Sequence, residues 1–300
     1  MSDDDAWRRL PLQSPRLPEW ARVLVGPLPM STGALLSLDS LHRADNPIGN
    51  TLAGQLRWIA ADAIGCTYAR KCAEADLLRN GESIDAILAL RNDDPRWSPI
   101  QRASFKFAEQ MTLGASLVTD EEVTALSQHY GHAAVVGMVH TVAFANFQNR
   151  LFLSLGISHD DQGPLPPIDW PLDLNQGQAA DAWKRPTHEE LLKSALPVEL
   201  TPKSDWNVQP LELLDKRQRE QQQRKGRVPI PDDGALSCLP AEQIERSGPI
   251  IWSRVSLGYQ PELTQGWFRL MAAFREESQL NRVFSNTVFW VVTRSNECFY

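Results

Sequence analysis

The sequence predicts an all-α protein, built from one complete helical unit and the opening of a second copy of it. Between residues 31 and 156, apolar side chains recur at helical spacing, and capping residues or glycines separate the periodic segments. No segment shows the alternation of apolar and polar residues that predicts a strand. After about residue 250, the sequence repeats the residues that follow position 20. We therefore expect a helical bundle, then a linker, then the first helices of a second bundle.

Each expected helix of the first unit has its own boundary signals. The expected helices run from Ser31 or Thr32 to about His42, from Asn50 to Gly65, from Cys66 to Asn80-Gly81, briefly from Ser83, from Ser98-Pro99 through Met111, from Thr119 to about Tyr130, and from about His132 to Leu155. Thr119 with Glu122 predicts a capping box. The last segment is apolar along one side, which is typical of the central element of a bundle.

Composition and charge exclude several classes of function. The chain has 300 residues, 42% of them hydrophobic and 22% charged, so most of it can bury a core. Its net charge of −7 disfavours a surface that binds nucleic acid or anionic membranes. The acidic start Met1-Ser2-Asp3 lacks the features of a secretory signal, and no apolar run is long enough to span a membrane. We expect a cytoplasmic protein with neither a membrane nor a nucleic-acid partner, and with reduced cysteines.

A proline-rich segment separates the two copies. Twelve of the 21 prolines lie between residues 158 and 249, a composition that predicts a linker or arm. The expected domains are therefore 1–156, the linker 157–249, and 250–300. Within the linker, Leu211 to Arg227 is a candidate basic helix, which is either a solvated face or a site for an anionic partner.

The internal repeat is the strongest signal in the sequence. Residues 20 and 252 are both tryptophan, and the same offset, 252 − 20 = 232, matches further residues without a gap. The other matched pairs are Arg22 and Arg254, Val23 and Val255, Gly26 and Gly258, Pro29 and Pro261, Thr32 and Thr264, Leu38 and Leu270, Arg43 and Arg275, Trp58 and Trp290, Cys66 and Cys298, and Tyr68 and Tyr300. The N-terminal arm is repeated too, since Asp3, Asp4, Ala6, Leu10 and Pro11 match Asp232, Asp233, Ala235, Leu239 and Pro240.

The second copy stops at the residue that matches Tyr68. We expect the 300 residues to be an inactive fragment of a longer protein, because the missing helices would leave an apolar surface around Leu270, Phe274, Val288 and Val291. The alternative is a helical tail that packs into a partner.

Cys66 lies between the end of one expected helix and the start of the next. A thiol at a helix N-terminus meets unpaired backbone amides, which lower its pKa and favour the reactive thiolate. A small buried core residue is the other interpretation, because free cysteine is among the most buried residue types. By the repeat, both interpretations extend to Cys298.

Several segments resemble the AhpD-like and carboxymuconolactone decarboxylase superfamily. They are Gln55 to Asn80-Gly81, Ser83-Ile84-Asp85-Ala86-Ile87, Arg102 to Glu109, and Ala145-Asn146-Phe147 with Arg150. The resemblance covers about residues 20–156 and resumes at about 250. It implies an AhpD-like helical bundle that associates into trimers or hexamers. In the peroxidase branch, two cysteines react with peroxide or accept electrons from a thiol reductant, while a His and a Glu move protons.

The first copy has only part of this set of two cysteines, a His and a Glu. Cys66 occupies the first cysteine position, but Ala69, Ala73 and Gly54 occupy the positions of the second cysteine, the His and the Glu. Cys72 is a poor substitute, because six residues of helix separate it from Cys66. We therefore hypothesise a thiol-dependent, peroxidase-like oxidoreductase whose site lies in the second copy at Cys298, with the first copy as a structural partner.

Two alternatives stay open. One is a cofactor-free decarboxylase or lactone-handling enzyme, which would use His, Arg or Glu around its pocket. The other is a non-catalytic interaction protein in which both copies are degenerate. We expect His129, His132 and His140 to be core or surface residues, and we expect neither a metal site nor a cofactor, since zinc-ligand spacing, a phosphate-binding glycine loop and Gly-X-Ser-X-Gly are all missing from the sequence.

Overall fold

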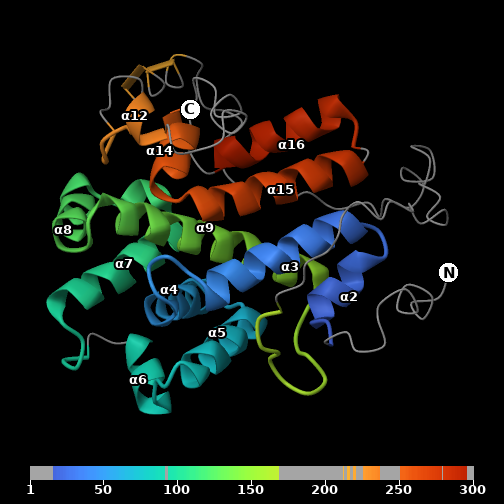
Figure 1. Ribbon diagram of the computed structural model, residues 1–300, viewed down its shortest axis with the longest axis horizontal. Coiled ribbons are helices and arrows are strands. Elements are labelled where there is room, and N and C mark those ends of the chain that lie inside the picture. Colours follow the sequence, from blue (N-terminus) through green and yellow to red (C-terminus); the bar gives the residue numbers. More distant parts are fainter. Residues whose placement is uncertain are drawn as a thin grey trace. The chain divides into compact units, whose positions relative to one another are not determined.

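The computed structural model describes residues 16–91, 94–168, 226–236, 251–278 and 280–295, together with the helical positions 212, 215–216 and 219–220. Every regular element in these residues is helical, which confirms the all-α prediction (Figure 1). The chain divides into two compact units. One contains residues 10–172 and 226–279, and the other contains 1–9, 173–225 and 280–300. Two helices of the second copy therefore belong to the same unit as the first copy.

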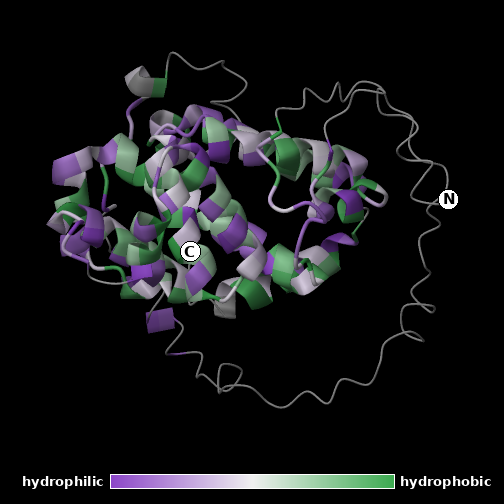
Figure 2. Cartoon of the chain, turned by 90° about the horizontal axis from the view of Figure 1, so that it is seen from below, coloured by the Kyte–Doolittle hydropathy of each residue, from purple (hydrophilic) through white to green (hydrophobic). Residues whose placement is uncertain are grey.

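The first copy forms a bundle in the larger unit. Its helices are α2 (Glu19–Val25), α3 (Pro29–Ala44), α4 (Asn50–Ala63), α5 (Thr67–Arg79), α6 (Ile84–Leu88), α7 (Pro99–Leu113), α8 (Asp120–Tyr130) and α9 (His132–Leu155), with short 3₁₀ turns at Ala89–Arg91 and Ala115–Leu117. Hydrophilic and hydrophobic residues are mixed along these helices (Figure 2), as expected where one face of each helix is buried.

Helix α4 is the centre of this bundle. It contacts α5, α7 and α9, and nine consecutive residues, 53–61, are buried. Leu56 and Trp58 belong to the main hydrophobic cluster with Phe107 of α7 and Met138 of α9. Burial on every side makes α4 the element whose sequence is most constrained by packing.

The helix starts confirm some capping predictions and correct others. The Thr119 and Glu122 capping box is present, with both reciprocal hydrogen bonds, and Ser98 with Gln101 forms another. The prediction that Ser31 or Thr32 caps α3 is wrong, because the helix begins at Pro29, a residue suited to a first turn. Asn50 is likewise the first residue of α4, and its cap is Gly49 at φ 87°, a left-handed value that favours glycine.

The second copy repeats the helices of the first. Its helices are α14 (Ile251–Tyr259), α15 (Pro261–Glu277) and α16 (Arg282–Ser295). Subtracting 232 from their bounds gives 19–27, 29–45 and 50–63, against 19–25, 29–44 and 50–63 for α2, α3 and α4. The repeat predicted from side chains is thus matched by the helix boundaries.

Local geometry is repeated as well. Leu28, before α3, has φ −139° and ψ 62°, and Gln260, before α15, has φ −139° and ψ 63°. The Thr32 hydroxyl donates to the Leu28 carbonyl at 2.7 Å, and the Thr264 hydroxyl donates to the Gln260 carbonyl at the same distance. The same dihedral angles and the same side-chain bond to the preceding turn therefore occur at both helix starts.

Helix α15 packs on α3, its own counterpart (Figure 1). Gly266 permits a close approach, because a Cβ atom there would lie 2.8 Å from Cδ1 of Leu38. The helices are antiparallel, since Glu277 at the end of α15 accepts hydrogen bonds from the backbone N–H groups of Met30 and Ser31 at the start of α3.

This packing corrects one expectation about the second copy. Leu270 is buried, with 6% of its surface exposed, because it lies one turn beyond Gly266 on the face of α15 that meets α3. Phe274 is exposed to 36% and Val288 to 45%, as the sequence predicts for these two residues.

Two further elements complete the described chain. The short helix α12 (Asp233–Leu236) contacts α14 in the larger unit. In the smaller unit, α16 exposes several large apolar side chains, among them Val283 at 73% and Phe289 at 70%. A search of the described residues finds no helix with the length and apolar character needed to cross a membrane.

The first prediction concerns the contact at the start of α3. Glu277→Ala removes the acceptor of two backbone N–H groups and of the Ser31 hydroxyl, so we expect the free energy of unfolding to fall by about 1–2 kcal/mol. Chemical denaturation measures this loss. The matched control is Glu276→Ala, which changes the exposed neighbour and should shift stability by less than about 0.5 kcal/mol. Equal effects of the two variants would contradict the capping role.

Candidate functional site

Cys66 lies where the sequence places it, as the N-cap residue of α5. Gly65, at φ 72°, makes the turn that follows α4, and the Cys66 carbonyl accepts the first helical hydrogen bond from Arg70 at 3.0 Å. Only 1% of Cys66 is exposed. Burial raises the pKa of its thiol, and the backbone N–H groups of Ala69 and Tyr68 offset only part of that rise. The neutral thiol is therefore the form present at pH 7.

In the first copy, the positions of the Glu and the His of the peroxidase branch hold small residues that are packed in the core. A Cβ atom on Gly54 would lie 2.9 Å from Leu77, so a glutamate does not fit there without displacing Leu77. Ala73 is fully buried in the main hydrophobic cluster. Cys72 is a buried free thiol, and burial raises its pKa to about 12. The first copy thus holds two neutral thiols and no proton relay at these positions.

Cys298 lies outside the described residues. The last described helix nevertheless ends in register with its counterpart. Cys66 lies three residues after α4 ends at Ala63, and Cys298 lies three residues after α16 ends at Ser295.

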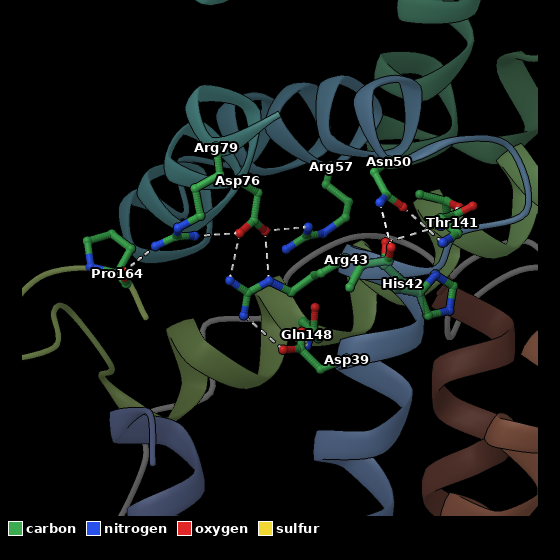
Figure 3. A network of polar contacts seen from close by, with 12 residues as sticks. Asp39, His42, Arg43, Asn50, Arg57, Asp76, Arg79, Thr141, Gln148 and Pro164 are labelled. Atoms are coloured by element: carbon green, nitrogen blue, oxygen red, sulfur yellow. Dashed lines mark hydrogen bonds and ion pairs between the residues drawn. The ribbon is translucent and has the colours of Figure 1, made fainter. Parts of the chain in front are cut away.

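A buried network of charged side chains is the most elaborate polar feature of the larger unit (Figure 3). Its centre is the carboxylate of Asp76, on α5. Arg43 of α3 donates to both oxygens, at 2.7 and 2.9 Å, and Arg57 of α4 donates to one of them at 3.0 Å. Arg79 donates to the other oxygen at 2.8 Å. Asp76, Arg43 and Arg57 are all buried, so each needs the others to offset desolvation.

The same network reaches α9 and the segment after it. Arg43 also donates to Asp39 at 3.0 Å, and Gln148 of α9 donates to the second oxygen of Asp39 at 2.8 Å. The guanidinium groups of Arg43 and Arg79 donate to the carbonyls of Leu165 and Pro164 at 2.7 and 2.8 Å. Four helices and the segment around 160–168 are therefore joined through one group of charges.

Electrostatics within the network keep Asp76 ionised. Burial by itself would raise the pKa of Asp76, but the hydrogen bonds and charges of Arg43 and Arg57 outweigh it and hold the pKa below its usual value. The Arg43 guanidinium also has its pKa raised, because Asp39 and Asp76 outweigh its desolvation.

A small pocket lies beside this network. Its volume is about 20 Å³, which is enough for one water molecule. Its polar lining comes from Asp39, Arg43, Arg57, Tyr68, Cys72, Gln148, Asn149 and Asp160. Asp160 accepts hydrogen bonds from the Tyr68 hydroxyl at 3.0 Å and from the backbone N–H of Glu19 at 2.7 Å. The pocket is thus built from α3, α4, α5, α9 and the segment after α9.

His42 of α3 and His140 of α9 are not among the residues that line this pocket. His140 has its pKa lowered to about 4 by burial, and the buried ring of His42 stacks on Phe144 with centroids 4.2 Å apart. Burial first, then the charges of His140 and Arg57, lower the pKa of His42 well below its usual value. Both rings are neutral at pH 7. Within the described residues, no group of three His, Cys, Asp or Glu side chains is placed to hold a metal ion.

Comparison of the chain with protein-family models, with curated proteins and with solved structures finds no match.

The charged network was not predicted from the sequence, although two local signals for it are present. Asp39 and Arg43 are four residues apart on one helix, a spacing that predicts a pair. Arg57 stands in the middle of the mostly apolar run 53–61 of α4. A cation in a segment otherwise destined for the core signals a buried acidic partner, but the identity of that partner, Asp76, depends on how α4 and α5 pack.

The second prediction concerns Asp76. Asp76→Asn keeps the volume but leaves Arg43 and Arg57 without their shared anion, so we expect a loss of about 3–5 kcal/mol in the free energy of unfolding at pH 7. The control is Asp62→Asn. Asp62 pairs with Arg70 and Arg91 nearer the surface, where an ion pair contributes about 1 kcal/mol or less.

The contribution of Asp76 to the free energy of unfolding should depend on pH in a defined direction. Because the folded pKa of Asp76 lies below its unfolded value, its stabilisation is present above about pH 4 and is lost as pH falls through the folded pKa. The stability difference between the wild type and Asp76→Asn should therefore shrink below about pH 4. Denaturation curves between pH 7 and the acid limit measure it. A difference independent of pH would show that Asp76 is not ionised in the fold.

Proposed function

We propose that the protein is a thiol-dependent, peroxidase-like oxidoreductase whose reactive thiol is Cys298 in the second copy. The observation that carries the proposal is the repeat of α2, α3 and α4 as α14, α15 and α16, with matching bounds and matching entry geometry. A cysteine follows each repeat at the same distance. The resemblance to the AhpD-like superfamily supplies the type of chemistry.

The geometry of the first copy supports this division of roles. Cys66 is a neutral buried thiol, and Gly54 and Ala73 are closed by core packing. A peroxide and a proton-transferring side chain cannot be placed at these positions without disturbing the close-packed core. We therefore assign the first copy the role of a structural partner, which α15 joins through its contact with α3.

The proposed reaction begins with the Cys298 thiolate. Its sulfur attacks one peroxide oxygen, an S–O bond forms, the O–O bond breaks, and the leaving oxygen takes a proton to become water or an alcohol. A thiol reductant then attacks the sulfenic acid sulfur, which releases water and forms a mixed disulfide. A second reductant thiol attacks that disulfide, which restores Cys298 and leaves the reductant oxidised. The proposal includes a homo-oligomer of the kind that the resemblance implies.

A second candidate is a cofactor-free enzyme related to the decarboxylases of the same superfamily. The pocket of the first copy has residue types that such an enzyme would use, Arg43, Arg57, Asp39 and Tyr68, beside Cys72, but its volume of about 20 Å³ holds one water molecule, so a substrate would need the pocket to open. Arginine binds carboxylates through paired hydrogen bonds, and a tyrosine or a carboxyl group can move protons. Such a reaction would not need Cys298.

The third prediction separates these functions. In the full-length protein, Cys298→Ser should lower the rate of peroxide consumption with a dithiol reductant by more than about a hundredfold, because it removes the nucleophile. Cys66→Ser is the matched control and should keep the rate within about twofold, since its thiol is neutral and buried. Mass spectrometry after sulfenic-acid trapping should label Cys298 alone. Peroxide turnover that survives Cys298→Ser would overturn the proposal.

A further inference from the structure

Three large apolar side chains are exposed on the second copy. Trp252 of α14 is exposed to 47%, and Met271 and Phe274 of α15 are each exposed to 36%. Gly266 marks the side of α15 that packs on α3, and the helical repeat places Met271 and Phe274 beside that contact, not within it. The Trp252 ring also lies against Phe268 of α15, with centroids 6.3 Å apart, so α14 and α15 contribute to one surface. We call Trp252, Met271 and Phe274 the apolar face of the second copy.

The equivalent positions in the first copy are covered by α9. Moved back by 232 residues, the apolar face corresponds to Trp20, Asp39 and His42. The Trp20 ring contacts that of Phe152, with centroids 6.1 Å apart. The His42 ring stacks on that of Phe144, with centroids 4.2 Å apart. Asp39 accepts a hydrogen bond from Gln148 at 2.8 Å. With these neighbours, the three positions of the first copy are buried.

The contacts of α9 define the kind of helix that such a face accepts. Phe144, Gln148 and Phe152 are spaced four residues apart, so they lie along one side of α9. The polar residue in the middle is matched to Asp39. In the second copy Met271 takes the place of Asp39, and a glutamine buried against it would have an amide N–H without an acceptor. The apolar face therefore favours a helix with an apolar residue in the middle position.

The apolar face continues an interface that α9 already makes with the second copy. Phe147 of α9 contacts Trp267 of α15, with ring centroids 5.6 Å apart. At the end of α14, the Gln260 side chain donates to the Ala133 carbonyl of α9 at 2.6 Å. Met271 lies one turn after Trp267, on the same side of α15. Helices α14 and α15 thus already contact one helix of the α9 type at the edge of the apolar face.

From these observations we infer that the apolar face is a docking site for an amphipathic helix of the α9 type, with two aromatic residues eight positions apart and an apolar residue midway. The aromatic side chains lie on Trp252 and Phe274, and the apolar residue lies on Met271. The α9 helix of the same molecule is already engaged with Trp20 and His42, so the occupant is a second helix of this type. Docking would bury large aromatic side chains, which dominate the energetics of protein interfaces. This role is independent of the thiol chemistry proposed for the second copy.

The fourth prediction uses peptides of α9 as probes. Two fluorescent peptides of residues 141–155 are titrated with the 300-residue chain, one with Gln148 and one with Gln148→Leu. Fluorescence anisotropy should rise to saturation with the leucine peptide, which should bind about tenfold more tightly than the glutamine peptide, because Met271 cannot accept a hydrogen bond from the amide. Adding Phe152→Ala to the leucine peptide should weaken binding by about tenfold or more, because it removes an aromatic anchor.

Paired variants of the chain assign the site. Met271→Asp introduces the residue of the first copy and should reverse the preference, so that the glutamine peptide binds more tightly than the leucine peptide. Ala272→Asp places the same charge at an exposed neighbour that is not part of the apolar face, and should keep the wild-type preference.

The peptide titrations of the wild-type chain need no variant, so a variant that fails to fold leaves the inference open to refutation. The absence of saturable binding by the leucine peptide, or equal effects of Met271→Asp and Ala272→Asp, would overturn it. Sedimentation measures whether the chain associates with itself. A dimer that excludes the peptide would assign the apolar face to a second copy of the chain, and would overturn the inference as well.

Discussion

The contact between α3 and α15 is the constraint on which the rest of the larger unit depends. Gly266 lets α15 approach Leu38 closely, and Glu277 binds the first backbone N–H groups of α3. One side of α3 is therefore held by α15, its counterpart in the second copy. The same helix supplies Asp39 and Arg43 to the charged network. The repeat thus does more than append helices to the first copy, since it fixes the helix on which the charged network is built.

The charged network joins α3, α4, α5 and α9 of the first copy. Buried charges are costly unless each is paired and hydrogen-bonded, and here Asp76 receives donors from Arg43, Arg57 and Arg79. Cys72 lines the pocket beside this network, where burial raises its pKa. Near Cys66, Ala73 contributes to the hydrophobic core instead of to proton transfer. The first copy is therefore organised around ion pairing and packing.

Much of the fold follows from local sequence signals, and much of the candidate site does not. Capping boxes at Ser98 and Thr119 involve neighbours three residues apart, so the sequence indicates them directly. The start of α3 was not predicted correctly, because its backbone N–H donors are satisfied by Glu277, which is distant in the sequence. The short helix α2 gave no clear periodic signal. The partners of Asp76 come from three helices, and only tertiary packing brings them together.

A crystal structure of the full-length protein that includes the residues around Cys298 tests the doubling most directly. We expect residues 251–298 to superpose on residues 19–66, with Cys298 as the N-cap of a helix, as Cys66 is for α5. If α16 instead leaves α15 in a different direction from that in which α4 leaves α3, or if Cys298 lies away from any helix start, then the second copy does not reproduce the first and its proposed thiol site is lost.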